Sequence, residues 1–162
     1  MDPHWVGVVT AIATGFGAAA AAVAAVAAIR IPIAIEKAAH TTRSFQAMNH
    51  SARVIDRAVA NKQSIDARNH KSVPEMFSFD YIKNNDDVRT EVYTILNEYE
   101  YLCLAANLGV FEGDVLMGLR GDALKQTYKD YDDFITRHRA SAPQNAKAWQ
   151  ACPRFIRRVT GK

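Results

Sequence analysis

Hydrophobic residues along the chain follow the spacing of helices rather than of strands. Apolar residues recur at intervals of three and four in two long segments, 38–59 and 88–106, and a shorter stripe starts at Leu124. No segment alternates apolar and polar residues with a period of two. The sequence therefore predicts an all-α protein with an N-terminal transmembrane helix, a long second helix and a small helical bundle. We place the membrane anchor at 1–35, the connecting amphipathic helix at 36–71 and the helical domain with its basic tail at 72–162.

The N-terminal segment, residues 5–29, contains no charged residue. A helix of this length covers about 37 Å, which exceeds the roughly 30 Å hydrocarbon core of a bilayer. Eleven of its residues are alanine and only nine are large and apolar. A cleaved signal peptide and a buried soluble helix are the alternatives. The preceding residues 1–4 carry no Lys or Arg, and the run is longer than a typical signal peptide core, so a retained membrane span is favoured.

The charges that flank this span predict its orientation. Asp2 precedes it, whereas Arg30, Lys37 and Arg43 follow it. Basic residues stay preferentially on the cytoplasmic side of a membrane. We therefore expect the N-terminus outside and the body of the chain in the cytoplasm.

Small residues recur at every fourth position within the span. They are Gly7, Ala11, Gly15 and Ala19. Small residues at this spacing make a smooth face on which a second membrane helix can approach closely. The sequence thus predicts a helix-packing face inside the membrane.

The next segment carries a narrow heptad pattern. Its positions are Ala38, Thr41, Phe45, Met48, Ala52, Ile55 and Val59. Such a seam either forms a coiled coil with a second copy of the chain or packs on the downstream helices. We favour packing on the downstream helices.

The rest of the chain divides into short helical segments. Residues 72–85 contain Pro74 and indicate a loop with a short helical piece. Asn85 or Asp86 can cap the strongest periodic helix, which ends at Gly109. Beyond it we expect a short helix at 114–119, a helix that starts after Asp122, and a last short helix at 143–151.

Charge is strongly segregated along the chain, although the net charge is only +3. Residues 1–74 sum to +4, residues 75–133 to −8 and residues 134–162 to +7. The basic tail includes Arg154, Arg157 and Arg158, which we expect to contact an anionic membrane surface or a partner protein. Nucleic acid is not an expected partner.

Sequence patterns of known catalytic and metal sites are missing. The five histidines form no pair at i and i+4, and the G-x-x-x-x-G at 113–118 lacks the following Lys. Glu91, Glu98 and Glu100 share a helix without the His of a di-iron motif, so solvated side chains are expected there, with a polar contact to Asn97 or Arg137 as an alternative for Glu100. Cys103 and Cys152 are expected to be reduced core thiols. We expect neither a cofactor nor an enzyme.

A resemblance to a known family emerges in residues 88–158. The chain shows an L-N-x-x-E helix, a glycine turn and an aromatic-Ile-x-R stretch, carried by Leu96, Asn97, Glu100, Gly109, Phe134, Ile135 and Arg137. This pattern resembles the bacterial family catalogued as domain of unknown function 4760. The resemblance implies a membrane helix joined to a helical cytosolic part, and it supplies no catalytic residues. It points to the bacterial inner membrane.

These patterns favour a function in binding rather than in catalysis. We expect an accessory or scaffolding subunit of a membrane assembly, which contacts other membrane proteins or itself. A regulatory or defence effector that perturbs the membrane, of phage origin for example, is the alternative.

Overall fold

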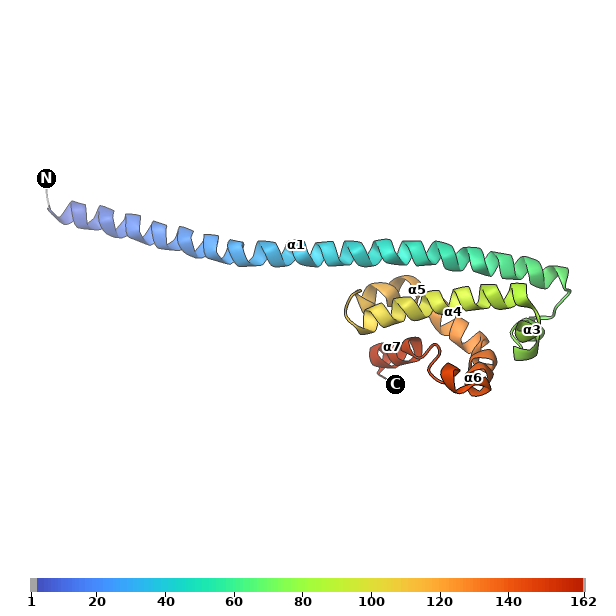
Figure 1. Cartoon of the computed structure of the whole chain (residues 1–162). Helices are drawn as coiled ribbons and strands as arrows, with labels where there is room; N and C mark the ends of the chain where they lie inside the picture. The colour runs from blue at the N-terminus through green and yellow to red at the C-terminus, as the bar shows by residue number, and fades with distance from the viewer. Residues whose placement is uncertain (1–2, 162) are drawn as a thin grey trace. The chain divides into compact units, whose positions relative to one another are not determined.

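In a computed structural model, the described part of the chain is all-α, as predicted. The structure describes the backbone of residues 3–161 and the side chains of Arg30 and residues 32–161. This part contains seven α-helices, one 3-10 helix and no strand (Figure 1). The chain divides into two compact units, residues 1–39 and 40–162.

Helix α1 runs from Pro3 to Arg68, and its residues from position 40 onward belong to the second unit. The buried positions there are Ser44, Met48, Ser51, Ile55, Ala58, Lys62 and Asp66. This stripe packs on the downstream helices, which is the favoured alternative. The predicted seam is rotated, however, because Phe45 is 47% exposed and four polar residues are buried instead. A search for apolar periodicity alone does not detect polar residues that pair in the core.

The predicted membrane span lies outside the residues whose side chains the structure describes. The same holds for its small-residue face, Gly7, Ala11, Gly15 and Ala19. Among the residues that are described, no helix combines the length and the apolar character needed to cross a bilayer.

Three helices follow α1 in the order that the sequence indicates. The short helices α2, Val73–Met76, and α3, Phe79–Asn84, occupy the expected loop. Helix α4, Asp86–Asn107, is capped by Asn85, whose Oδ1 accepts a hydrogen bond from the backbone N–H of Val88 at 3.2 Å. Gly109 has a φ of +72°, a left-handed conformation that favours glycine after a helix. The apolar residues that recur along this helix face are all buried, namely Val88, Val92, Ile95, Leu96, Tyr99, Leu102, Cys103 and Ala106.

Helices α5 and α6 divide the next segment differently from the prediction. Helix α5 runs from Gly113 to Asp130, through the point where a break was expected before Asp122. Helix α6, Asp132–Ser141, begins after a break at Tyr131. Gly121 lies buried inside this helix, where an added Cβ would lie 3.0 Å from the end of the Met117 side chain. A glycine with such a packing role is tolerated inside a helix at a cost of about 1 kcal/mol.

The final helix also starts later than predicted. A 3-10 turn, Pro143–Asn145, replaces the expected helix, and α7 spans Ala151–Thr160. Pro153 lies in the first turn of α7, where a missing N–H breaks no helical hydrogen bond. The proline therefore starts α7 together with Ala151 and Cys152.

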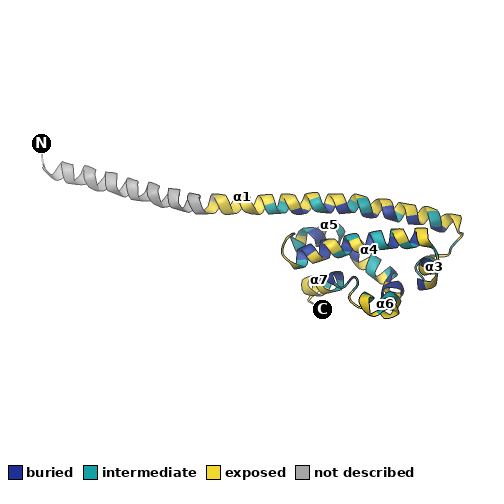
Figure 2. Cartoon of the chain, in the orientation of Figure 1, coloured by how far each residue is buried: buried dark blue, intermediate teal, exposed yellow. Residues whose placement is uncertain are grey.

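Two groups of buried side chains form the core of the second unit. Figure 2 marks the buried residues along its helices in dark blue. We call the first the aliphatic cluster; it joins α1, α4, α5 and α7 and includes Ile55, Leu102, Leu116, Leu124 and Phe155. The second, the aromatic cluster, joins α3, α4, α6 and the segment before α7. It includes Phe79, Ile82, Tyr131, Phe134 and Trp149.

The two cysteines meet inside the aliphatic cluster. Cys103 of α4 and Cys152 of α7 are fully buried, with Cα atoms 5.0 Å apart, and they form a disulfide. The prediction of reduced thiols was wrong, because sequence spacing does not reveal that α7 folds back against α4. The bond fixes the last helix to the centre of the unit.

Candidate interaction surface

The L-N-x-x-E motif of α4 holds the segment that leads into α7. The Oδ1 atom of Asn97 accepts a hydrogen bond from Trp149 Nε1 at 2.8 Å. Glu100 accepts hydrogen bonds from the backbone N–H groups of Ala151 at 2.7 Å and Cys152 at 3.2 Å. A carboxylate at this position satisfies free N–H groups at the start of α7 and complements the helix dipole. Neither predicted partner of Glu100, Asn97 or Arg137, bonds to it.

Glu100 also contacts the phenol of Tyr128, which donates a hydrogen bond to Oε2 at 3.3 Å. Burial and the adjacent carboxylate raise the pKa of Tyr128 far above its ordinary value. The phenol therefore stays protonated and remains a donor. Glu100 thus links α4, α5 and α7 and has a structural role.

Arg139 of α6 secures the same segment from the other side. Its Nε and Nη2 atoms donate to the carbonyl oxygens of Ala148 and Trp149, each at 2.8 Å. Trp149 has a φ of +51°, which is uncommon for a bulky residue and costs about 1 to 2 kcal/mol. The contacts of Trp149 with Asn97 and Arg139 maintain this conformation.

The other residues of the family pattern are also structural. Phe134 and Ile135 are buried in the aromatic cluster. Arg137 forms a two-pronged ion pair with Asp80 of α3, both N···O distances being 3.1 Å, and lies over the Phe79 ring. Phe134, Ile135 and Arg137 thus hold α6 and α3 together.

A buried ion pair on α1 was not detected from the sequence. Lys62 Nζ lies 2.6 Å from Asp66 Oδ2, and both side chains are almost completely buried. Tyr81 donates a hydrogen bond to the other carboxylate oxygen of Asp66 at 2.8 Å. The Lys62 ammonium also lies over the Phe77 ring, 4.9 Å from its centroid. The i, i+4 spacing of Lys62 and Asp66 was the available signal, but such spacing usually marks an exposed pair.

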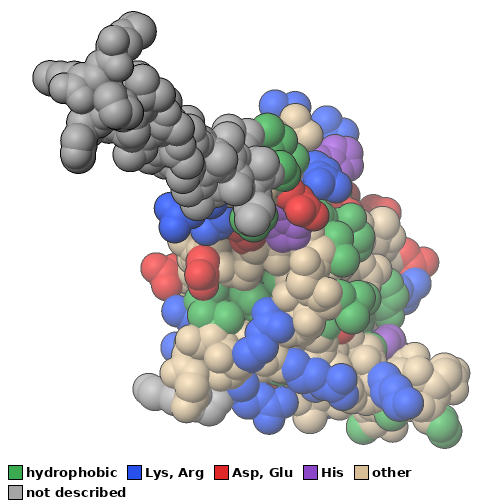
Figure 3. Space-filling model, turned by 90° about the vertical axis from the view of Figure 1, so that its left-hand side faces the viewer, with side chains coloured by type: hydrophobic (Ala, Val, Ile, Leu, Met, Phe, Trp, Pro, Cys, Tyr) green, Lys and Arg blue, Asp and Glu red, His purple; other side chains and the backbone are tan. Residues whose placement is uncertain are grey.

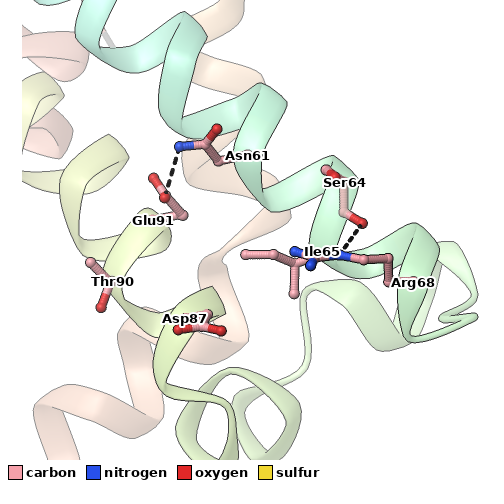
Figure 4. A pocket seen from close by; sticks show the side chains of 7 residues that line it. All are labelled: Asn61, Ser64, Ile65, Arg68, Asp87, Thr90 and Glu91. Atoms are coloured by element: carbon pink, nitrogen blue, oxygen red, sulfur yellow. Dashed lines mark hydrogen bonds between the residues drawn. The ribbon is translucent and has the colours of Figure 1, made fainter.

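The acidic residues considered for chemistry do not converge. Glu91 lines an open groove of about 330 Å³ between α1 and α4, where it accepts a hydrogen bond from Asn61 at 3.0 Å (Figure 4). Glu98 lines another groove, and Glu100 holds α7. Within the described residues, no three His, Cys, Asp or Glu side chains are arranged to bind a metal ion.

An apolar strip on α4 remains uncovered. Tyr101, Leu104 and Leu108 are 54%, 48% and 71% exposed, and their spacing of three and four places them along one helix face. We call these residues, with the exposed Val110, the α4 strip. A groove of about 450 Å³ lies beside it, lined by Ala47, His50, Ser51, Glu98 and Tyr101. Exposed apolar side chains therefore lie next to one another beside an open groove.

The predicted basic contact residues lie on α7. Arg154, Arg157 and Arg158 are exposed and share one side of the helix. Arg158 donates to the carbonyl oxygens of Ala106 and Asn107 at 2.8 and 3.2 Å and so covers the C-terminal end of α4. The three arginines therefore lie together on α7, but only Arg158 binds the end of α4.

Comparisons with known proteins identify a family without a described activity. Neither a curated protein nor a solved structure matches the chain. A family model matches residues 15–159, which include every residue of the pattern noted in the sequence. The chain thus belongs to the family described as a domain of unknown function, DUF4760.

Proposed function

We propose that the protein is a non-enzymatic membrane-anchored binding protein, an accessory or scaffolding subunit of a membrane assembly. The observation that carries this proposal is the α4 strip, where several large exposed apolar side chains lie next to one another. An apolar strip beside a groove is a common docking surface for a partner helix. The charge-free run at 5–29 serves as the anchor in this proposal.

The expected occupant of the strip is another protein of the same membrane. The ring of His40 lies 3.2 Å from the Gly109 carbonyl oxygen, and Ser44 Oγ accepts a hydrogen bond from the Glu112 N–H. The end of the strip formed by Leu108 and Val110 therefore lies close to His40 and Ser44, the first residues of the second unit. Only ten residues of sequence separate His40 from the end of the charge-free run. A membrane protein is thus the partner within easiest reach.

Co-purification from native membranes tests this function. The tagged full chain, extracted in a mild detergent, is expected to retain a defined partner at fixed stoichiometry. Leu104→Gln together with Leu108→Gln should reduce that retention at least tenfold, because the strip loses its apolar area. Val73→Gln together with Leu119→Gln is the matched control, since these residues are 68% and 51% exposed on other helices.

Two results would refute the proposal. One is a full chain that runs as a lone monomer and retains no protein. The other is equal loss of the partner in the α4 strip variant and in its control. The anchor is tested separately by alkaline extraction of membranes, which should leave an inserted chain in the pellet.

Association within the membrane is a second part of the same proposal. Gly7, Ala11 and Gly15 replaced together by Leu should preserve insertion, because leucine is more apolar than glycine or alanine. The bulkier face should weaken helix packing by preventing close approach. Crosslinking of the full chain in membranes measures this, and unchanged association would reduce the span to an anchor.

A further inference from the structure

A small pocket between α6 and α7 has an unusual set of lining residues. It measures about 270 Å³ and is lined by Arg139, Gln150, Pro153, Arg154 and Arg157. Three of these five side chains are arginines, and none is acidic. Converging cations repel one another unless an anion lies between them.

Arg139 is held in place before any ligand arrives. Two of its three nitrogens are bound to the carbonyl oxygens of Ala148 and Trp149, which orients the guanidinium plane. Its Nη1 atom has no hydrogen-bond partner in the described part of the chain. A fixed guanidinium with a free N–H edge loses little entropy when it binds an oxyanion.

The two arginines of α7 supply the opposite wall. Gln150 accepts a hydrogen bond from Arg154 Nη2 at 2.9 Å, and Arg157 Nε donates to the Pro153 carbonyl oxygen at 3.3 Å. Their spacing of three residues places them on one helix face. Every ion pair found among the described residues involves cations other than Arg139, Arg154 and Arg157.

The surroundings of the pocket favour an anionic ligand. Residues 134–162 contain seven Lys and Arg and no Asp or Glu. Figure 3 shows Lys and Arg side chains gathered on the lower part of the second unit, with the acidic side chains higher on that face. The nearby carboxylate of Glu100 is already occupied by the start of α7.

We propose that this pocket binds a single phosphate group, supplied by a phospholipid headgroup or by a soluble phosphate compound. Planar guanidinium groups match the oxygens of phosphate with paired, charge-assisted hydrogen bonds. The site lies on α6 and α7, away from the α4 strip. Failure to find a protein partner would therefore leave it intact, and loss of phosphate binding would leave the proposed function intact.

Calorimetric titration of the full chain in non-ionic detergent tests the site. Inorganic phosphate is expected to bind saturably with one site per chain, at constant ionic strength set by chloride. Arg154→Gln together with Arg157→Gln should weaken binding about tenfold or more, since each lost charge-assisted bond is worth more than 1 kcal/mol. Phosphatidic acid added to the micelles should abolish the phosphate signal if the headgroup occupies the pocket, and leave it unchanged if the ligand is soluble.

The control variant separates a built site from general positive charge. Arg53→Gln together with Arg57→Gln removes the same charge from exposed positions on α1 and should bind phosphate as the parent chain does. Equal weakening in both variants, or no saturable binding by the parent chain, would overturn the proposal. Binding of a single-stranded oligonucleotide without binding of phosphate would also overturn it. Circular dichroism and the melting temperature check that each variant is folded.

Discussion

The two clusters of the second unit are stabilised by different means. The aliphatic cluster contains the disulfide and packs α7 through the fully buried Phe155. The aromatic cluster has no covalent link; it surrounds the Lys62–Asp66 pair with rings and stacks His138 on Phe134 with centroids 5.8 Å apart. The aliphatic cluster is therefore closed by a covalent bond, whereas the stability of the aromatic cluster depends on an ion pair and on the protonation state of His138. Both clusters draw residues from helix α4, so the two kinds of stabilisation act within one unit.

The largest effect is expected from opening the disulfide. Cys103→Ser together with Cys152→Ser releases a loop that the bond closes across 49 positions of sequence. The free energy of unfolding should fall by about 4 kcal/mol, since the unfolded chain gains loop entropy. Urea unfolding of the full chain in detergent measures it. Reduction of the parent chain with dithiothreitol should match the variant, and an unchanged unfolding free energy would mean that the bond does not stabilise the aliphatic cluster.

The second largest loss of stability is expected from breaking the Lys62–Asp66 ion pair of the aromatic cluster. Lys62→Met leaves the Asp66 carboxylate buried without its cation, at an expected cost of about 3 kcal/mol. The cost lies at the low end because Tyr81 still donates to Asp66. Adding Asp66→Leu to the same chain should restore most of the stability, because the unpaired charge is then removed. If the double variant is as unstable as Lys62→Met alone, packing rather than charge explains the loss.

Smaller losses of stability are expected from removing the hydrogen bonds of Glu100 and Asn97, and their sizes should differ. Glu100→Gln should cost about 2 kcal/mol because a charged acceptor is lost at the start of α7. Asn97→Ala should cost about 1 kcal/mol because it loses only the neutral bond to Trp149 Nε1. Urea unfolding compares them directly. A larger loss for Asn97→Ala would place the main support of this segment in the aromatic cluster instead.

The smallest effect is expected from pH. Burial lowers the pKa of His138 below its usual value near 6.5, so the fold favours the neutral ring. Its contribution to stability is present above about pH 6.5 and is lost as the pH falls from there toward the lower pKa of the folded chain.

His138→Phe removes this titration, and thermal unfolding between pH 8 and pH 5 measures the difference. The stability gap between variant and parent should widen toward acid in favour of the variant. A gap that stays constant across this range would mean that His138 does not titrate on unfolding.

The sequence predicted the helices whose apolar faces are regular. It did not predict the helix boundaries and contacts that depend on polar residues, glycine, proline or cysteine. Helix α4 was predicted with its cap, its buried face and its glycine end, because all of these signals are local. The boundary at Tyr131, the late start of α7 and the Cys103–Cys152 bond were missed, because each depends on contacts between distant segments. The same limit applied to Asn97 and Glu100, whose partners lie some fifty positions away. Arg154 and Arg157 were singled out by charge alone, but their meeting with Arg139 appears only in three dimensions.

The position of α7 has a consequence for the order of events during synthesis. Both clusters need residues from the C-terminal segment, Trp149 in one and Phe155 in the other. These are made about 120 residues after the end of the charge-free run at position 29. At ordinary translation speeds of roughly 5 to 20 residues per second, this is a delay of about 6 to 24 s. With the proposed membrane anchor, the N-terminal run would reach the membrane while the body that it carries is still without a core.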